Sequence, residues 1–219
     1  MCGRIFVQPD LDELLGVLDA LLDGPAAGAG GPRWNIAPTE PVPVLHLAGG
    51  ARQLEFARWG LIPPWWSKER PPTHTFNARA EGLTEAPTFR GALRSGRVVV
   101  PVSGFYEWRT VDGARAPVAI RGPGPVLGLG GLCATRRGPD GPSRSATVIT
   151  TAASPAMAEI HDRMPVLLPP EVWDMWMNPD VPFAELSPWL QPSSLALHIE
   201  PVGSAVGNAR DKSGSWMVA

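Results

Sequence analysis

The chain has 219 residues, of which 44% are hydrophobic and 18% are charged, so it is long enough to bury a substantial core. Its formal net charge of −2 gives no bulk support for nucleic-acid binding, which would have to use a local basic patch. No apolar stretch is long enough to span a membrane, and the lack of a signal peptide, with only two cysteines, indicates a cytoplasmic protein.

The first predicted helix begins at Asp10, an N-cap residue that is followed by Glu13 three positions later. Five leucines then fall on one helical face, the last of them being Leu22, and Gly24 ends the run. Residues 24–32 are rich in Gly, Ala and Pro, which is typical of a surface loop.

Beyond this loop the apolar spacing shortens to the alternation typical of strands. Strands are expected at Pro43–Leu47, Gln53–Trp59, Arg97–Val100, Phe105–Arg109, Pro117–Arg121, Val126–Leu132, Ala146–Thr151 and Leu195–Ile199, and short helices at Glu81–Leu93, Ser154–Ile160 and Glu171–Met177. The pattern predicts an α+β fold, mainly an antiparallel β-sheet or open barrel with a few flanking short helices. The candidate linkers at 24–32 and 137–145 are short, which favours a single domain over residues 1–219.

Cys2 is the first candidate for chemistry. Methionine before a small residue is normally removed during synthesis, and its removal would free the α-amine of Cys2. That amine can condense with an aldehyde to an imine, and the thiolate can then close on the imine carbon to give a thiazolidine. The amine has a pKa of about 8 and the thiol of about 8.5, so modest tuning makes both nucleophilic. The structural alternative is an ordinary frayed terminus.

Six short motifs follow one another along the chain. They are Cys2-Gly3-Arg4, Trp34–Thr39, Trp59–Trp66, Phe76–Glu81, Gly104–Trp108 and Ile160–Pro165. In this order they resemble the SOS response-associated peptidase family, or SRAP domains, from Met1 to about Val206. The resemblance implies a protein that senses abasic sites in single-stranded DNA and shields them through a thiazolidine link to the N-terminal cysteine. The peptidase label implies self-removal of Met1.

The resemblance also places catalytic groups at Cys2, Asn77, Glu107 and His161, which folding is expected to gather into one small cleft. His161 suits the proton transfers that open an abasic sugar near neutral pH. Glu107 can hold the amine and relay its protons, and Asn77 can fix the sugar or the amine. Each also has a structural interpretation: a solvent-facing strand residue for Glu107, a surface turn or helix cap for His161, and a turn for Asn77.

The predicted strand-binding residues are aromatic and basic. Trp65 and Trp66 follow two prolines, on a stiff loop that could wedge between bases, and at least one of the two rings is expected to be exposed. Arg4, Arg79 and Arg163 lie beside the reactive positions and would contact phosphates, or else form ordinary surface ion pairs.

The remaining tryptophans are assigned to the core: Trp34, Trp59, Trp108, Trp173, Trp176 and Trp189. Cys133 is expected to be a buried, inert thiol. The four histidines and two cysteines show no metal-ligand spacing, so neither a metal nor a cofactor is expected. The only predicted partner is abasic single-stranded DNA, bound by a monomer.

Two alternative functions remain open. The first is an N-terminal-nucleophile hydrolase in which Cys2 attacks peptides or amides, with its own amine as the base. The second is a non-catalytic module that binds single strands by tryptophan stacking. Imine chemistry also permits strand cleavage as a lyase side activity.

Overall fold

A computed structural model describes residues 2–25, 30–139 and 141–217. The strands are β1 (Ile5–Val7), β2 (Leu21–Leu22), β3 (Arg33–Ile36), β4 (Pro41–Ala48), β5 (Ala51–Trp59), β6 (Asn77–Arg79), β7 (Arg97–Val102), β8 (Gly104–Val111), β9 (Ala114–Arg121), β10 (Leu127–Gly138), β11 (Gly141–Ala152), β12 (Arg163–Pro165), β13 (Leu167–Leu168) and β14 (His198–Pro201). The α-helices are α1 (Leu11–Leu18), α2 (Pro87–Ser95), α3 (Pro155–Ala158), α4 (Trp173–Met177) and α5 (Phe183–Leu186). Short 3₁₀ helices are η1 (Ala80–Gly82), η2 (Pro170–Val172), η3 (Ser187–Leu190), η4 (Ser204–Gly207) and η5 (Ser215–Met217). The predicted α+β class, with mostly antiparallel strands and a few short helices, is confirmed.

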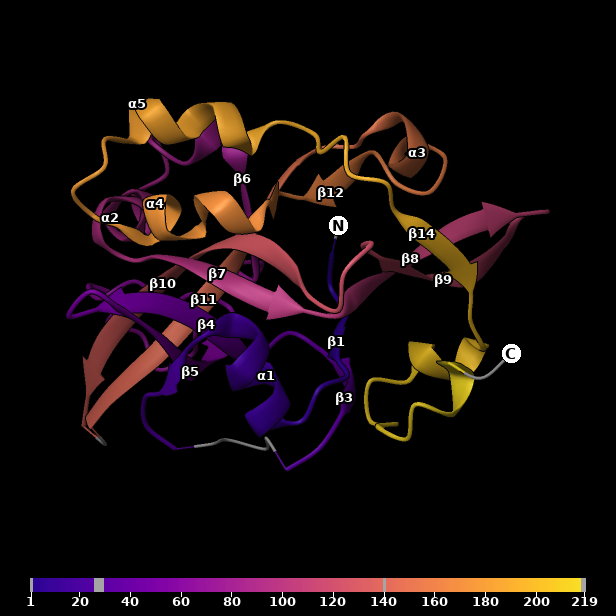
Figure 1. Cartoon of the computed structure of the whole chain (residues 1–219), viewed down its shortest axis with the longest axis horizontal. Coiled ribbons are helices and arrows are strands. Elements are labelled where there is room, and N and C mark those ends of the chain that lie inside the picture. Colours follow the sequence, from indigo (N-terminus) through magenta and orange to yellow (C-terminus); the bar gives the residue numbers. More distant parts are fainter. Residues whose placement is uncertain (1, 26–29, 140, 218–219) are drawn as a thin grey trace.

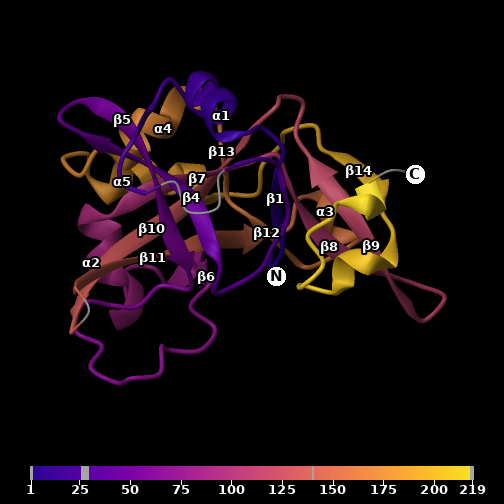
Figure 2. The same ribbon diagram turned by 90° about the horizontal axis from the view of Figure 1, so that it is seen from below.

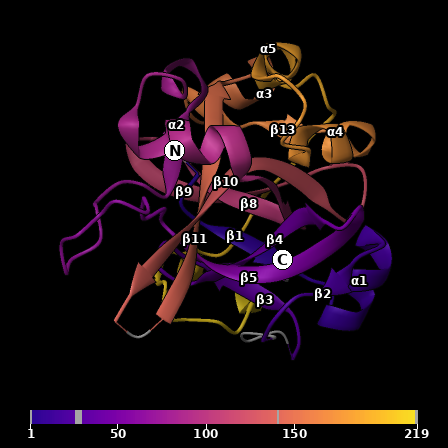
Figure 3. The ribbon, with the colours of Figure 1, turned by 90° about the vertical axis from the view of Figure 1, so that its left-hand side faces the viewer.

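Five strands form a closed ring, which is the barrel of this fold. Strand β4 pairs with β5, β5 with β11, β11 with β10, β10 with β7, and β7 with β4. Every residue of β7 is buried, because this strand runs between the barrel interior and the covering helices α2 and α4. Figure 3 shows the β10–β11 hairpin extending beyond the other strands. Ring closure leaves these five strands with no long free edge.

A second sheet, of order β14-β9-β8-β1-β3, lies beside the barrel (Figure 1). The chain crosses from the barrel to this sheet at Ser103–Gly104, between β7 and β8. A Cβ atom on Gly104 would lie 2.4 Å from the carbonyl oxygen of Ile120 and 2.5 Å from the ring of Phe6. The close approach of these backbones therefore requires glycine.

The C-terminal segment closes a small separate core on the second sheet. Phe6 and Tyr106 are fully buried there together with Val206 and Trp216. The hydroxyl of Tyr106 donates to the carbonyl oxygen of Trp34 at 2.9 Å and accepts from the indole N–H of Trp216 at 3.1 Å. Residues near the end of the chain are thus anchored to the strand that carries Glu107.

Strand β11 positions two further segments of the chain. Its residues Val148–Thr150 pair in parallel with β6, and Thr150–Ala152 pair antiparallel with β12. Thr150 has a partner in both strands, so β6 and β12 occupy opposite edges of β11. Asn77 opens β6, and His161 lies just before β12.

The first helix is shorter than predicted. Asp10 caps it as expected, since its carboxylate accepts from the Glu13 N–H at 2.9 Å. However, α1 ends at Leu18 because Asp19 adopts the left-handed conformation, with φ 49° and ψ 54°. The predicted helical position of Leu22 is wrong, since Leu21–Leu22 form β2 and pair in parallel with β5.

Two other segments also differ from the prediction. The helix expected at Glu81–Leu93 begins only at Pro87, where a residue without an N–H suits the first helical turn. A linker is predicted at 137–145, but residues 137–138 belong to β10 and 141–145 to β11, which pair up to Gly138 and Gly141. Cross-strand pairing supplies hydrogen bonds that local composition does not reveal.

The core assignments of the tryptophans are confirmed in part. Trp59, Trp173 and Trp176 are buried, whereas Trp34 and Trp108 are half-buried against the Phe6 and Tyr106 core. The core assignment of Trp189 is wrong, because this side chain is 38% exposed. Cys133 is buried as predicted, and burial raises its thiol pKa to about 12. Of the helices in the described residues, none is sufficiently long and apolar to span a bilayer.

Candidate active site around Cys2

Cys2 lies at the junction between the barrel and the second sheet. It precedes β1, and Figures 1 and 2 show this end of the chain beside β12, between the two halves of the molecule. The residue is fully buried. The side-chain N–H of Asn77 donates to the carbonyl oxygen of Cys2 at 2.8 Å. A residue of the barrel edge therefore holds the backbone of Cys2 in place.

Glu107 approaches Cys2 from the second sheet. Ile5 pairs with Phe105, and the N–H of Tyr106 donates to the carbonyl oxygen of Arg4 at 2.9 Å, so the same register brings Glu107 beside the residues that precede β1. The side chain of Glu107 is buried. Burial raises the pKa of the Cys2 thiol well above its usual value, and the negative charge of Glu107 raises it further. The thiol is therefore uncharged at neutral pH in this enclosed arrangement.

The amide oxygen of Asn77 is also buried, and within the described residues it has no hydrogen-bond partner. A buried acceptor without a partner costs about 1–3 kcal/mol. The amide is thus held by its N–H group while its oxygen remains available to a donor that enters the site. Cys2, Asn77 and Glu107, three of the four groups expected to share one small cleft, are all buried.

His161 is positioned by a different segment, between α3 and β12. Its N–H donates to the carbonyl oxygen of Met157 at 2.9 Å, and its ring is partly exposed. The ring Nδ1 lies 2.8 Å from a carboxylate oxygen of Asp162 and 3.0 Å from the N–H of Arg163. These contacts require different protonation states, since Nδ1 accepts from Arg163 only when unprotonated and donates to Asp162 only when protonated. A change in the protonation of Nδ1 therefore exchanges one partner for the other.

The three predicted phosphate ligands differ in their surroundings. Arg79 is exposed. Arg163 makes a bidentate ion pair with Glu81 at 2.6 and 2.9 Å and donates to the carbonyl oxygen of Thr150 at 2.7 Å. Contact between Arg163 and a phosphate would require it to exchange Glu81 for the new anion.

Arg4 is held from two sides. It donates to the side-chain oxygen of Asn35 at 2.8 Å and to the carbonyl oxygen of Val206, and it lies 5.7 Å from the ring centroid of Trp108. Burial lowers its pKa from the usual value. Its charge faces the segment after β14, so Arg4 has a structural role within the described residues, and its contact with a phosphate stays a prediction.

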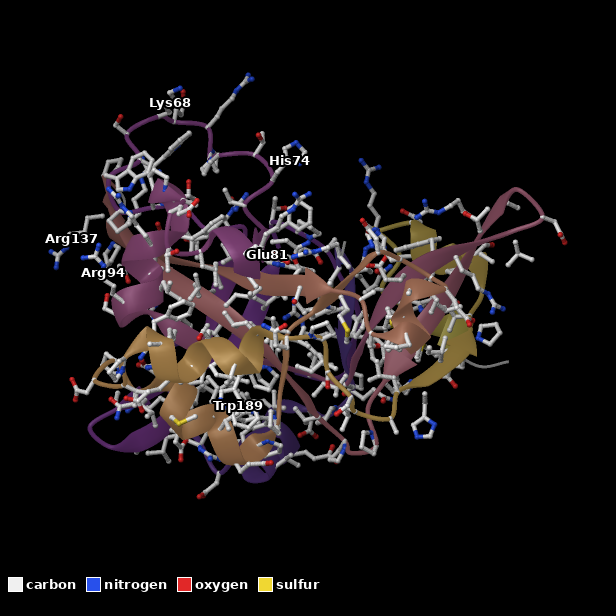
Figure 4. All side chains as sticks on the ribbon, turned by 90° about the horizontal axis from the view of Figure 1, so that it is seen from above. Lys68, His74, Glu81, Arg94, Arg137 and Trp189 are labelled. Atoms are coloured by element: carbon white, nitrogen blue, oxygen red, sulfur yellow. The ribbon has the colours of Figure 1, made fainter. Side chains whose placement is uncertain are left out.

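Trp65 and Trp66 lie on the long connection between β5 and β6. Figure 4 shows this connection protruding, with Lys68 and His74 on it, well away from Trp189. Trp65 is 58% exposed, which confirms that one of the two rings faces solvent. Trp66 is half-buried, and its indole N–H donates to the carbonyl oxygen of Arg70 at 2.9 Å. Trp65 is thus the more accessible of the two rings, and the indole of Trp66 is bonded within the loop.

Asn35 has a structural role that the sequence analysis did not assign. Its side-chain N–H group donates to the carbonyl oxygens of Val206, Asn208 and Asp211 at 3.3, 3.0 and 2.9 Å. Its oxygen accepts from Arg4, two residues after Cys2. The local signal was an amide between the apolar residues Trp34 and Ile36, because a buried amide rarely lacks several partners.

The chain matches the sequence profile of the family described as SOS response associated peptidase (SRAP) over residues 1–209. It is 36% identical over 184 residues to the abasic site processing protein YoqW of Bacillus subtilis (strain 168), covering 82% of this chain and 81% of that one. It is 28% identical over 222 residues to the abasic site processing protein YedK of Escherichia coli (strain K12), covering 97% and 96%. A crystal structure of a Bacteroides thetaiotaomicron protein shares the fold, with a TM-score of 0.85, 21% identity and 93% of each chain covered. The chain therefore belongs to the SRAP family.

Proposed function

We propose that this protein processes abasic sites in single-stranded DNA by linking Cys2 covalently to the open aldehyde of the lesion. The observation that carries the proposal is the convergence of Asn77 and Glu107 on Cys2 from two different sheets. The names of its relatives, which are abasic site processing proteins, support the choice of substrate.

The chemistry begins with the loss of Met1, which converts the amide nitrogen of Cys2 into a free amine. This amine attacks the aldehyde carbon, and loss of water gives an imine. The thiol then adds across the C=N bond, with sulfur on carbon and the proton on nitrogen, to close the thiazolidine. No oxidant or cofactor is needed.

Burial of the thiol explains why a base is required. A thiol with a raised pKa is a poor nucleophile until its proton is removed. Glu107 lies close enough to affect that pKa, so we assign it the role of accepting the thiol proton and returning it to nitrogen. We assign His161 to opening of the sugar ring, because its contacts accommodate both protonation states. Asn77 orients Cys2.

The DNA strand would approach across Trp65 and Arg79, which are the exposed members of the predicted DNA-binding residues. A base stacked on Trp65 would contribute about 1–3 kcal/mol. Arg163 and Arg4 would join phosphates only after exchanging the partners described above. One copy of the chain holds all four reactive groups, so we expect a monomer to react.

The decisive measurement is the intact mass of the protein after incubation with an oligonucleotide that carries one abasic site. We expect loss of Met1 and the gain of one DNA strand with loss of one water. Cys2→Ala should form no heat-stable conjugate, whereas Cys133→Ala, the matched control at the other cysteine, should react normally. A conjugate that persists in Cys2→Ala would refute the assignment of the nucleophile.

The two alternative functions give different results in the same experiment. A hydrolase would cleave small peptides or amides in trans, in addition to any cleavage after Met1. A non-catalytic module would retain the DNA under native conditions and release it on a denaturing gel. Strand cleavage by Cys2→Ala, which keeps a terminal amine, would reveal the lyase side activity.

A further inference from the structure

A second group of chemically active side chains lies on the barrel wall. It consists of Asp23, just after β2, His46 in β4 and Glu55 in β5. The register of β4 and β5 pairs Val44 with Glu55, so His46 and Glu55 are diagonal neighbours on one face of the sheet. The backbone N–H of Asp23 donates to the carbonyl oxygen of Leu54 at 2.8 Å, which fixes the third member beside the other two.

The three side chains point at a common centre. The Nε2 atom of His46 is 3.4 Å from an oxygen of Asp23 and 3.8 Å from an oxygen of Glu55, and all three atoms lie within 4.8 Å of one another. Both distances are longer than a hydrogen bond, and Nε2 is buried without a hydrogen-bond partner among the described residues. Metal bonds of about 2.0–2.2 Å in a tetrahedral arrangement hold ligand atoms roughly 3.4 Å apart. The spacing therefore fits an ion better than a direct contact.

We propose that Asp23, His46 and Glu55 bind one divalent transition-metal ion of the Zn²⁺ class, with water completing its coordination. One imidazole and two carboxylates form a ligand set that suits this class of ion. The side chains of His46 and Glu55 are only 17% and 12% exposed, whereas that of Asp23 is 51% exposed. His46 and Glu55 would be held in place before the ion binds, and Asp23 would complete the protein ligands from the solvent side.

Arg144 limits the affinity that this site can have for a cation. Its guanidinium group donates to the same oxygen of Glu55. A carboxylate oxygen has more than one lone pair, so it can accept this hydrogen bond and bind a metal ion at the same time. The positive charge of Arg144 opposes a second cation, and the proposed affinity is therefore moderate. An ion here would tie the short edge strand β2 to the barrel through β4 and β5.

The test is calorimetric titration of the EDTA-treated full chain with ZnCl₂. A Cys2→Ala background is used because a terminal cysteine can itself bind zinc. We expect one Zn²⁺ per chain and affinity reduced at least about tenfold by Asp23→Asn or His46→Gln. Because Asp23 is exposed, Asp23→Asn should fold normally, and this is checked by circular dichroism. His198→Gln, at an exposed histidine on β14, is the matched control and should bind as the background does.

Arg144→Gln tests the direction in which zinc affinity changes. Loss of the competing positive charge should tighten zinc binding, whereas a purely structural cluster would show no such gain. The proposal is overturned if no saturable binding occurs, or if Asp23→Asn and His46→Gln bind zinc as tightly as the His198→Gln control. The second result would leave the three side chains as a structural cluster on the barrel wall.

Discussion

In the proposed reaction, Cys2 has to be both protected and reactive. Its thiol is buried, and its raised pKa keeps it neutral, which protects it from oxidation and from unwanted acylation. The same raised pKa makes it dependent on a nearby base. Glu107 raises the pKa of the thiol and is also the proposed acceptor of its proton, so one carboxylate controls both properties.

The substitution Glu107→Gln separates the effect of Glu107 on the thiol pKa from its proposed role as the proton acceptor. Removal of the charge should lower the pKa of the Cys2 thiol, so that thiolate absorbance at 240 nm develops at lower pH than in the wild type. The rate of DNA conjugation should nevertheless fall by about 10²-fold or more, because the proton relay is lost. The titration uses a Cys133→Ala background, because burial raises the pKa of the Cys133 thiol to about 12 and its thiolate would overlap the signal of Cys2. A wild-type conjugation rate in Glu107→Gln would exclude it as the base.

The ion pair of Glu81 and Arg163 offers a second test at single residues. The hydrogen bond from Arg163 lowers the pKa of Glu81, so the carboxylate is charged at neutral pH and masks the guanidinium. Glu81→Gln should expose the positive charge, tighten reversible DNA binding several-fold and steepen its salt dependence by about one unit of slope. Fluorescence anisotropy at several salt concentrations measures both. If Glu81→Gln and Arg163→Gln leave affinity unchanged, Arg163 is structural.

At the scale of elements, the proposed stacking residue Trp65 lies on a connection, whereas Asn77 and Glu107 lie on strands. The connection between β5 and β6 presents Trp65, while the pairing of β6 with β11 sets the position of Asn77. A loop can tolerate change that a paired strand cannot, because its backbone is not part of a ladder. Substitutions in the two kinds of element should therefore affect binding and stability separately.

The loop prediction concerns Trp65→Ala. Loss of the exposed ring should weaken single-strand binding by about 1–3 kcal/mol, which is roughly 5- to 150-fold in the dissociation constant, with an unchanged melting temperature. Trp189→Ala is the matched control, since it removes a second exposed indole from a distant part of the molecule (Figure 4). Equal losses in both variants would argue against a specific platform.

The strand prediction concerns Gly104→Ala. The new methyl group would collide with the backbone of Ile120 and the ring of Phe6, and the variant should lose about 1–3 kcal/mol of unfolding free energy. Gly91→Ala provides the contrast, because Gly91 is helical and a Cβ atom there meets nothing within 4 Å. That variant should gain about 0.5–1 kcal/mol. Denaturant titrations compare the two directly, and equal stability would contradict the packing argument.

At the scale of the whole molecule, the segment after β14 is bonded to residues near the start of the chain. Asn35 bonds the segment after β14 through three carbonyl groups and holds Arg4 with its oxygen. Lys212 strengthens the same junction by donating to the carbonyl oxygen of Asn35 and to Glu40. The C-terminal segment is thus part of the support for the residues between Cys2 and β1.

Asn35→Asp tests this support with almost no change in shape. A carboxylate oxygen would face three carbonyl oxygens in place of the donor, and the unfolding free energy should fall by about 1–3 kcal/mol. Asn208→Asp is the control, because the side-chain oxygen of Asn208 only accepts, from the Arg210 N–H, and aspartate can do the same. Limited proteolysis should release the C-terminal segment first in Asn35→Asp. Equal resistance in the two variants would contradict the role of Asn35.

Local patterns in the chain were sufficient for the fold class, for several strands and for the family. Alternating apolar residues mark β5 and β9, the aspartate before Leu11 marks the start of α1, and six motifs in order mark the SRAP relationship. Each of these signals resides in neighbouring residues or in their identity. For the same reason, the candidates Cys2, Asn77 and Glu107 could be named before their proximity was known.

Only the folded chain decides which strands pair and which charges meet. The ring closes through β5 and β11, the proposed zinc ligands come from three segments, and Arg163 finds Glu81 across 82 positions. The sequence predicted a linker where β10 and β11 pair, and a buried Trp189 where the side chain is exposed, because both features depend on distant contacts. Pairing and burial depend on contacts between distant segments, and the periodicity of a single segment carries no information about its partner.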